Sequence, residues 1–268
     1  MRVLACVLAL CASAPGAGHV AVRHAGGRVP GVAATGHAPG LQRLFVHGRL
    51  VYEHWETGPF VPLKVSSDGR WLFFYVDEYG AVSAIADGTS LYVVSTRGGP
   101  AHVLGTMLPY RDYIAWCGGE AVWIDGKDRV AIHAKRLFAA APPDWRPHDL
   151  WPDRARSFSA PACQPRHDAV AVLVQRSSAV ANFFATRWRL WIVGMNGGRR
   201  LVDRPPAGSA DEEPVWAPDG ASLLFVRERN GYGRVMLRTH GRLYGPLRNL
   251  GRALGYYGHR DWGLAWRR

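Results

Sequence analysis

The sequence predicts an all-β fold in which a unit of four short strands repeats about every 50 residues along the chain. The first observation is a recurring Asp-Gly or Gly-Gly turn that stands directly before a short apolar run. The second is the spread of 31 glycines and 18 prolines over 268 residues, which favours many strands and turns over long helices. The third is the near-constant spacing of these turns.

The first half of each unit is a short strand, a tight turn and an apolar strand. The clearest case is EPVWAPDGASLLFV over 213–226, where Asp219-Gly220 makes the turn because glycine accepts a positive φ without a Cβ clash. The C-terminal DWGLAWRR supplies only a first strand. Positions taken as equivalent lie 50, 47, 53 and 50 residues apart: Ser66, Trp116, Cys163, Trp216 and Trp266.

The second half of each unit is another hairpin. SLYVVSTRGGPAHVL (90–104) and RLWIVGMNGGRRLV (189–202) both contain a strand, a Gly-Gly turn and a strand. The segment 234–247 repeats the pattern with His240-Gly241 at its turn. Four strands in about 50 residues is the size of a β-propeller blade.

The unit PVWAPDGASLLFV…RVMLRTHGRLYGPL resembles the PD40, WD40-like repeat of TolB-type β-propellers. The match is close over 213–250, fair over 63–105 and 159–203, and weak in the second half of the unit that starts at 113. It covers most of the chain beyond residue 41, so we expect no counterpart of the N-terminal α/β domain of TolB within residues 1–40. The resemblance implies a fold and no particular chemistry.

The Trp and Asp-Gly of the repeat have structural roles in this interpretation. We expect Trp216 on the first strand of a blade, where a large side chain fills the wedge between neighbouring blades. Asp219-Gly220 then turns the chain into the second strand. Asp68 and Asp219 are therefore predicted to be turn residues and not catalytic acids.

We expect five blades, the last of which combines the two ends of the chain. Residues 43–52 resemble an isolated second-half hairpin, and the C-terminal strand can join it so that no sheet edge stays open. The missing strand of this composite blade is expected from HVAVR at 19–23. The propeller then spans 41–268, and the Gly-, Pro- and Ala-rich residues 19–40 form a linker or loop.

Residues 1–18 have the order of a secretory signal peptide, with one positive charge, a short apolar run and then small residues. Cleavage can follow Ala14 or Gly18, and Pro15 disfavours the first. Cys11 lies in a loose match to a lipobox, so lipid attachment stays open. We expect an exported protein, periplasmic or extracellular, with no later segment long and apolar enough to span a bilayer.

Removal of residues 1–18 leaves two cysteines, Cys117 and Cys163. Export favours a disulfide between them. Cys163 aligns with Trp116, however, so Cys117 lies one position later, and adjacent strand positions point to opposite faces. A disulfide and two buried thiols remain alternatives. No CxxC or Cys/His spacing indicates zinc.

The formal charge of +12 is a reason to consider nucleic acid as a partner. The cations are almost all Arg and are scattered along the chain instead of clustered, so we do not expect nucleic-acid binding. The expected partner is an envelope or secreted protein, or a saccharide, and the expected oligomeric state is a monomer.

The sequence offers little for catalysis. It contains no G-x-S-x-G motif, no paired His spacing for a metal and no phosphate-binding glycine loop before a helix. Asp77-Glu78 and Asp211-Glu212-Glu213 are interpreted as solvated loop ends. We therefore expect no catalytic, cofactor or metal residues, and a binding or scaffold module of the cell envelope. The alternative is a propeller enzyme that acts on carbohydrate through the central channel.

The candidate binding residues lie in two segments. The Pro- and Trp-rich segment 138–158 breaks the repeat and is predicted to be an insertion on one face. Trp and Arg are frequent interface anchors, although the two Trp can equally serve local packing. The candidates are Trp145, Arg146, Trp151, Arg154 and Arg156, with Phe183 and Phe184 in the loop before Trp188.

Overall fold

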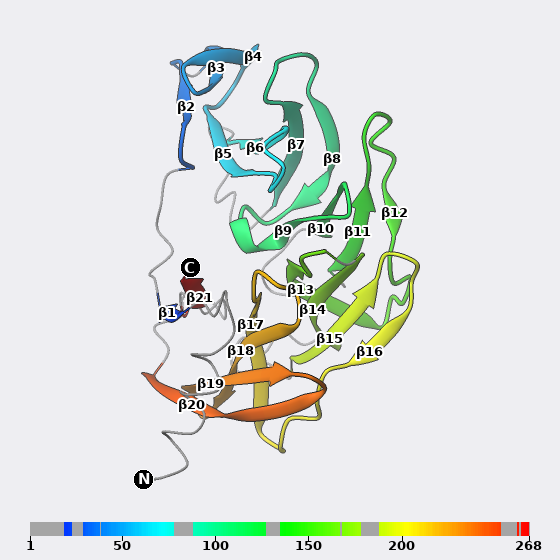
Figure 1. Ribbon diagram of the computed structural model, residues 1–268. Helices are drawn as coiled ribbons and strands as arrows, with labels where there is room; N and C mark the ends of the chain where they lie inside the picture. The colour runs from blue at the N-terminus through cyan, green and yellow to red at the C-terminus, as the bar shows by residue number, and fades with distance from the viewer. Residues whose placement is uncertain are drawn as a thin grey trace.

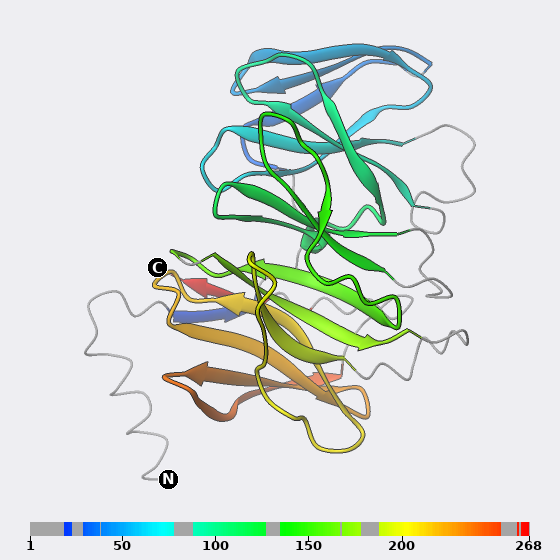
Figure 2. The same ribbon diagram turned by 90° about the vertical axis from the view of Figure 1, so that its right-hand side faces the viewer.

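The computed structural model describes 21 strands and one short 3-10 helix, and these strands form six sheets. All strand pairs are antiparallel. Figure 1 shows the sheets arranged around a centre, and Figure 2 shows them stacked as successive layers from the blue to the orange end. The described residues are 19–22, 29–37, 39–77, 88–126, 135–166, 168–177, 188–252, 262 and 264–267.

Four of the sheets are four-stranded blades whose strands follow chain order, which confirms the predicted unit. The first blade contains β5 (Phe60–Val65), β6 (Trp71–Val76), β7 (Thr89–Ser95) and β8 (His102–Met107). The second contains β9 (Ile114–Cys117), β10 (Glu120–Asp125), β11 (Arg136–Ala140) and β12 (His148–Asp149). The third contains β13 (Arg156–Cys163), β14 (Ala169–Arg176), β15 (Arg189–Gly194) and β16 (Arg199–Leu201). The fourth contains β17 (Ser209–Trp216), β18 (Ser222–Arg229), β19 (Tyr232–Thr239) and β20 (Arg242–Arg252).

We had expected the segment 138–158 to be an insertion, and this expectation was wrong. It contains the end of β11, all of β12 and the start of β13, so it completes the second blade. The expectation was wrong because β12 has only two residues, too few to show an apolar alternation in the sequence.

The register of the first strands corrects the alignment by one residue. Cys163 pairs with Val170 and Trp216 pairs with Leu223, and the same position in the first blade is Val65, which pairs with Leu72. Ser66 is instead the first residue of the turn, because its carbonyl accepts the N–H of Gly69 at 2.9 Å.

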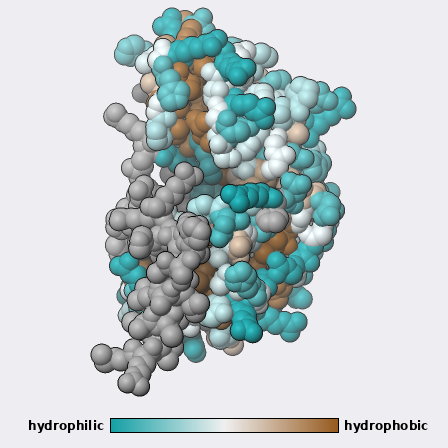
Figure 3. Space-filling view, viewed as in Figure 1, coloured by the Kyte–Doolittle hydropathy of each residue, from teal (hydrophilic) through white to brown (hydrophobic). Residues whose placement is uncertain are grey.

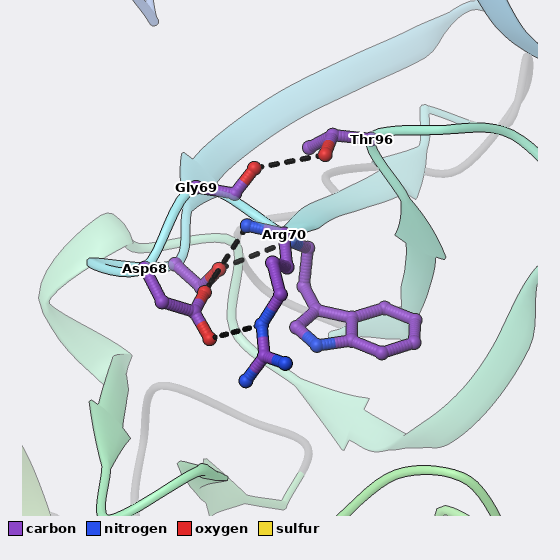
Figure 4. Close-up of polar contacts among 6 residues, drawn as sticks. Asp68, Gly69, Arg70 and Thr96 are labelled. Carbon is purple, nitrogen blue, oxygen red and sulfur yellow. Dashed lines mark hydrogen bonds and ion pairs between the residues drawn. The ribbon is translucent and has the colours of Figure 1, made fainter.

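The Asp-Gly turn of the first blade is closed by the Asp68 carboxylate, as Figure 4 shows. One of its oxygens accepts the Ser66 hydroxyl and the backbone N–H of Arg70, and the other accepts Arg70 Nε at 2.9 Å. Gly69 has a φ of 74°, and its carbonyl accepts the Thr96 hydroxyl at 2.8 Å. Asp68 therefore has the structural role that the sequence predicted.

Replacing Asp68 with alanine is expected to lower the free energy of unfolding by about 1–2 kcal/mol, because three hydrogen-bond donors lose their acceptor. Asp219 accepts one bond in the matching turn, from the N–H of Ala221 at 2.8 Å. Asp219→Ala should therefore cost less, and urea unfolding of both variants measures the difference. Equal losses in the free energy of unfolding would show that the additional hydrogen bonds of Asp68 do not contribute to stability.

The same variant should change the response to acid. Burial alone would raise the pKa of Asp68, but the hydrogen bonds from Ser66 and Arg70 outweigh it and hold the pKa below 3.8. Stabilisation by this carboxylate is thus present above pH 3.8 and is lost as the pH falls through the lower folded value. The unfolding curves of wild type and Asp68→Ala should converge in that range.

The core lies between neighbouring blades. Phe60, Leu72 and Phe74 of the first blade pack against Leu44 and Val51 of the sheet before it. Figure 3 shows apolar side chains in this region, between the hydrophilic outer surfaces of the two sheets. The largest cluster joins the first three blades around Trp123, which is fully buried. Blade-to-blade packing is therefore the main apolar contact of the fold.

The first-strand Trp residues connect neighbouring blades by hydrogen bonds as well as by packing. Trp216 Nε1 donates to the carbonyl of Ala162 in the third blade at 3.1 Å. Trp266 Nε1 repeats this contact with the carbonyl of Val215 in the fourth blade at 3.2 Å. The predicted wedge position of Trp216 is thus confirmed, and the indole nitrogen adds a polar anchor to it.

The two ends of the chain pair with each other. β1 (His19–Val22) is antiparallel to β21 (Leu264–Arg267), so that Val20 lies opposite Trp266. This confirms that residues of the HVAVR segment form the strand that pairs with the C-terminal strand. The sheet lies against β17 of the fourth blade.

The expected number of five blades is wrong for the described residues, which form six sheets. The N-terminal hairpin does not join the C-terminal strand but forms its own three-stranded sheet of β2 (Val32–Thr35), β3 (Gly40–Val46) and β4 (Arg49–Glu56). Residues 19–40 therefore contain β1 and β2 and are not only a linker. β2 was missed because its residues are largely exposed and show no apolar alternation.

Candidate axial binding site

The two Trp residues that we considered as interface anchors are buried. Trp145 is 3% exposed and meets Trp71 edge-on, with ring centroids 4.7 Å apart. Trp151 is 5% exposed and packs against Trp191. The guanidinium carbon of Arg199 lies over its ring, 4.6 Å from the centroid. Of the two alternatives for these indoles, the structure shows local packing.

The remaining candidates do not form one surface with the indoles. Arg146 and Arg154 are exposed, and Arg156 is half-buried in an ion pair with Asp153 at 3.3 Å. Phe183 and Phe184 lie outside the described residues. The candidate binding residues that the structure describes therefore do not form one continuous surface.

A pocket of about 590 Å³ lies at the inner strand of the first blade. The pocket is broad and largely open to solvent. Leu63, Lys64 and Val65 of β5 line one side, and Arg111 and Asp112 of η1 (Arg111–Tyr113) line another. Val29 and Pro30 complete the lining. We call this the axial pocket, because β5 and β9 face the centre of the ring in Figure 1.

Tyr113 fixes the position of η1. Its ring is buried beside Tyr110, with centroids 5.3 Å apart, and its hydroxyl shares a hydrogen bond with Ser159. Burial raises the pKa of Tyr113 strongly, so the phenol stays neutral. With Tyr113 held in the core, Arg111 and Asp112 are left exposed at the pocket.

Lys64 extends from β5 toward the second blade. Its ammonium donates to the carbonyl of Ile114 at 2.7 Å. Burial lowers the pKa of Lys64, whereas Asp112 and the thiols of Cys117 and Cys163 act in the opposite direction. The pocket thus combines an apolar wall with two cations and one carboxylate.

Cys117 and Cys163 lie together beside Lys64. Both are free thiols here, and the Cys163 thiol donates to the carbonyl of Gln164 at 3.7 Å. The neighbouring Cys117 thiol lowers the pKa of Cys163 with help from Lys64, although burial opposes it, and burial raises the pKa of Cys117. The one-residue offset brings the side chains together instead of separating them. Trp116 packs toward Phe73 of the first blade, so Cys117, one position later, faces the third blade, where Cys163 lies.

We had expected a solvated loop end at Asp211, Glu212 and Glu213, and this expectation was wrong. They lie in β17, where Asp211 is fully buried and accepts Arg227 Nε at 2.8 Å. Glu212 and Glu213 accept bonds from the segment at 262–264. Their carboxylates are thus engaged in structure. The expectation failed because three consecutive acids are usually exposed.

Sequence reasoning also missed the lining of the axial pocket. Lys64, Arg111 and Asp112 belong to no local motif, and their only sequence signal is the position of Lys64 on a first strand next to an Asp-Gly turn. Within the described ranges, no group of three His, Cys, Asp or Glu side chains is placed to bind a metal ion. The same ranges contain no helix of the length and apolarity needed to cross a bilayer.

Solved structures of similar fold were found. A protein of Agrobacterium tumefaciens assigned as TolB superposes with a TM-score of 0.50 and 15% identity, over 81% of this chain and 76% of that one. The chain has a TolB-like β-propeller fold. Puromycin hydrolase has a TM-score of 0.51 and 15% identity to this TolB-like propeller, over 80% of this chain and 34% of the hydrolase.

A structure from a study of two prolyl endopeptidases has a TM-score of 0.52 and 10% identity to the TolB-like propeller, over 83% and 34% of the two chains. At such identities the likeness shows the fold alone. No family model matches. One of the subunits of the light-independent protochlorophyllide reductase of Chloroflexus aggregans is 28% identical over 155 residues, 53% of this chain. The TolB-like propeller spans only 26% of that relative.

Proposed function

We propose that this TolB-like propeller is an exported binding module of the cell envelope, which holds a protein or ligand at the axial pocket. The observation that carries the proposal is the composition of that pocket. Lys64, Arg111 and Asp112 surround an apolar wall of Leu63 and Val65 in a volume of about 590 Å³. A few charged groups on an apolar concave surface are the usual features of a recognition site.

The alternative, hydrolysis of carbohydrate, finds less support. Retaining and inverting glycosidases both need two carboxyl groups about 5–10 Å apart that face the substrate. Among the residues that line the axial pocket, Asp112 is the only carboxylate. The carboxylates of β17 serve the fold through Arg227 and the backbone of 262–264.

Two features support export. Residues 1–18 have the composition of a signal peptide. β1 begins at His19, the residue that follows the expected cleavage after Gly18, so cleavage there would leave the sheet of β1 and β21 intact. N-terminal sequencing of the protein from the envelope fraction tests this, and a retained Met1 would contradict it.

Arg111→Glu is expected to abolish capture of the partner, because it reverses a charge at the mouth of the axial pocket without removing a core contact. The measurement is an affinity pull-down from envelope extract with the wild type and the variant side by side. Arg49→Glu is the matched control, since Arg49 is an exposed residue of β4 outside the pocket.

A partner that is lost with Arg111→Glu and retained with Arg49→Glu supports the proposal. Identical capture by all three proteins would show that the pocket is not the binding site. Incubation of the wild type with oligosaccharides provides the second readout, and appearance of cleavage products would favour the enzyme.

A further inference from the structure

A second cavity, of about 200 Å³, lies between the third and fourth blades. Ile192 of β15 and Arg200 of β16 line it from one blade, and Trp216, Leu223 and Arg238 line it from the other. It shares no lining residue with the axial pocket. The cavity therefore does not depend on the function proposed above.

Arg238 is the group in this cavity that requires an explanation. It lies on β19 opposite Leu223, and its Nη1 is shielded from solvent. Within the described part of the chain this nitrogen has no hydrogen-bond acceptor. An unpaired donor of this kind leaves the positive charge of the Arg238 guanidinium poorly compensated by the protein.

The charges around the cavity are unbalanced. Burial lowers the pKa of Arg238, the positive charge of Arg200 lowers it further, and Asp203 acts in the opposite direction. Asp203 is already paired, because it accepts Arg227 Nη2 at 3.0 Å. His240 also lines the cavity and contributes no negative charge. The site therefore favours an anion.

The shape of the cavity restricts which anion fits. The indole of Trp216 is held in place by its Nε1 bond to Ala162, and it lines the cavity together with Ile192 and Leu223. A guanidinium binds a carboxylate through two parallel hydrogen bonds. An indole face packs well against a flat apolar body.

We propose that this cavity binds a small organic carboxylate, with its carboxyl group at Arg238 and Arg200 and its apolar body against Trp216. The ligand compensates the positive charge that Arg238 and Arg200 place at the cavity. It also joins the third blade to the fourth, since its two cationic contacts come from β16 and β19.

The test is isothermal titration of the full chain with benzoate as the probe. Saturable binding with a dissociation constant of about 1 mM or below is expected for the wild type. Arg238→Met keeps an aliphatic side chain and removes the guanidinium group. It should weaken benzoate binding at least about tenfold, which corresponds to 1.4 kcal/mol. Arg200→Met should weaken it several-fold.

Arg234→Met is the matched control, because Arg234 is an exposed residue of the same strand outside the cavity. It should leave benzoate binding unchanged. Benzamide, which has the same ring without the charge, should bind far more weakly than benzoate. Thermal unfolding of Arg238→Met without ligand verifies that this variant is folded, and Arg200→Met gives an independent readout at an exposed residue.

Three results would overturn the proposal. The first is a wild type that shows no saturable binding of benzoate. The second is equal binding of benzoate by the wild type and the folded Arg238→Met variant. The third is binding of inorganic phosphate without binding of benzoate, which would assign the cavity to a different anion.

Discussion

Replacing Trp262 with alanine is expected to destabilise the propeller by about 3–5 kcal/mol, the usual loss for a buried indole. Trp262 is 7% exposed and contacts Gly233 so closely that a Cβ there would lie 2.5 Å from the ring. Its Nε1 donates to Glu212 at 2.8 Å and its N–H donates to Glu213 at 2.8 Å. The variant therefore also removes the indole hydrogen bond to the buried carboxylate of Glu212.

Chemical denaturation followed by fluorescence measures this loss. Trp55→Ala is the matched control, since the same substitution at a side chain that is 59% exposed should change stability by less than about 0.5 kcal/mol. Deletion of 262–268 should exceed both, because it also leaves β1 without a partner strand. Equal stability of the Trp262 and Trp55 variants would mean that the contacts of Trp262 do not stabilise the propeller.

Oxidation is expected to join Cys117 and Cys163, which lie 46 positions apart in the sequence, and to stabilise the fold by about 4 kcal/mol in the chain-entropy model. The two thiols are neighbours, and the lowered pKa of Cys163 favours the thiolate that attacks a disulfide. Oxidised glutathione serves as the oxidant: it accepts two electrons and leaves as two reduced molecules.

The experiment uses a chain in which Cys6 and Cys11 are replaced by serine, so that only this pair remains. After oxidation and denaturation, a maleimide should label no thiol, and the midpoint of urea unfolding should rise. Two labelled sites after oxidation would exclude the bond. Cys163→Ala is the control that separates the bond from other effects of the oxidant.

The four-stranded unit could be predicted because its signals are local. A turn such as Asp68-Gly69 and the apolar strand that follows it lie within a dozen residues of each other. The sheet of β1 and β21 depends on pairing between residues more than 200 positions apart, and β2 in the other terminal sheet has no apolar face. The strand pattern at the two ends therefore indicated that they meet but did not assign the hairpin at 43–52 to a sheet of its own.

The candidate sites were harder to predict than the fold. Trp145 and Trp151 belong to residue types that are enriched in interfaces, and the sequence does not distinguish an exposed indole from a buried one. Lys64 and Arg111 meet at one pocket because a blade returns the chain to the axis after its fourth strand. Such a meeting leaves no spacing rule in the sequence.

The pairing of β1 with β21 determines how the molecule responds to tension applied at its two ends. His19 and Arg267 lie opposite each other at one end of this two-stranded sheet, so the pull opens the ladder from that end. Its hydrogen bonds then break one after another instead of together, which needs little force. The blades between the two strands carry no load until this sheet has separated, so we expect this sheet to open first under tension.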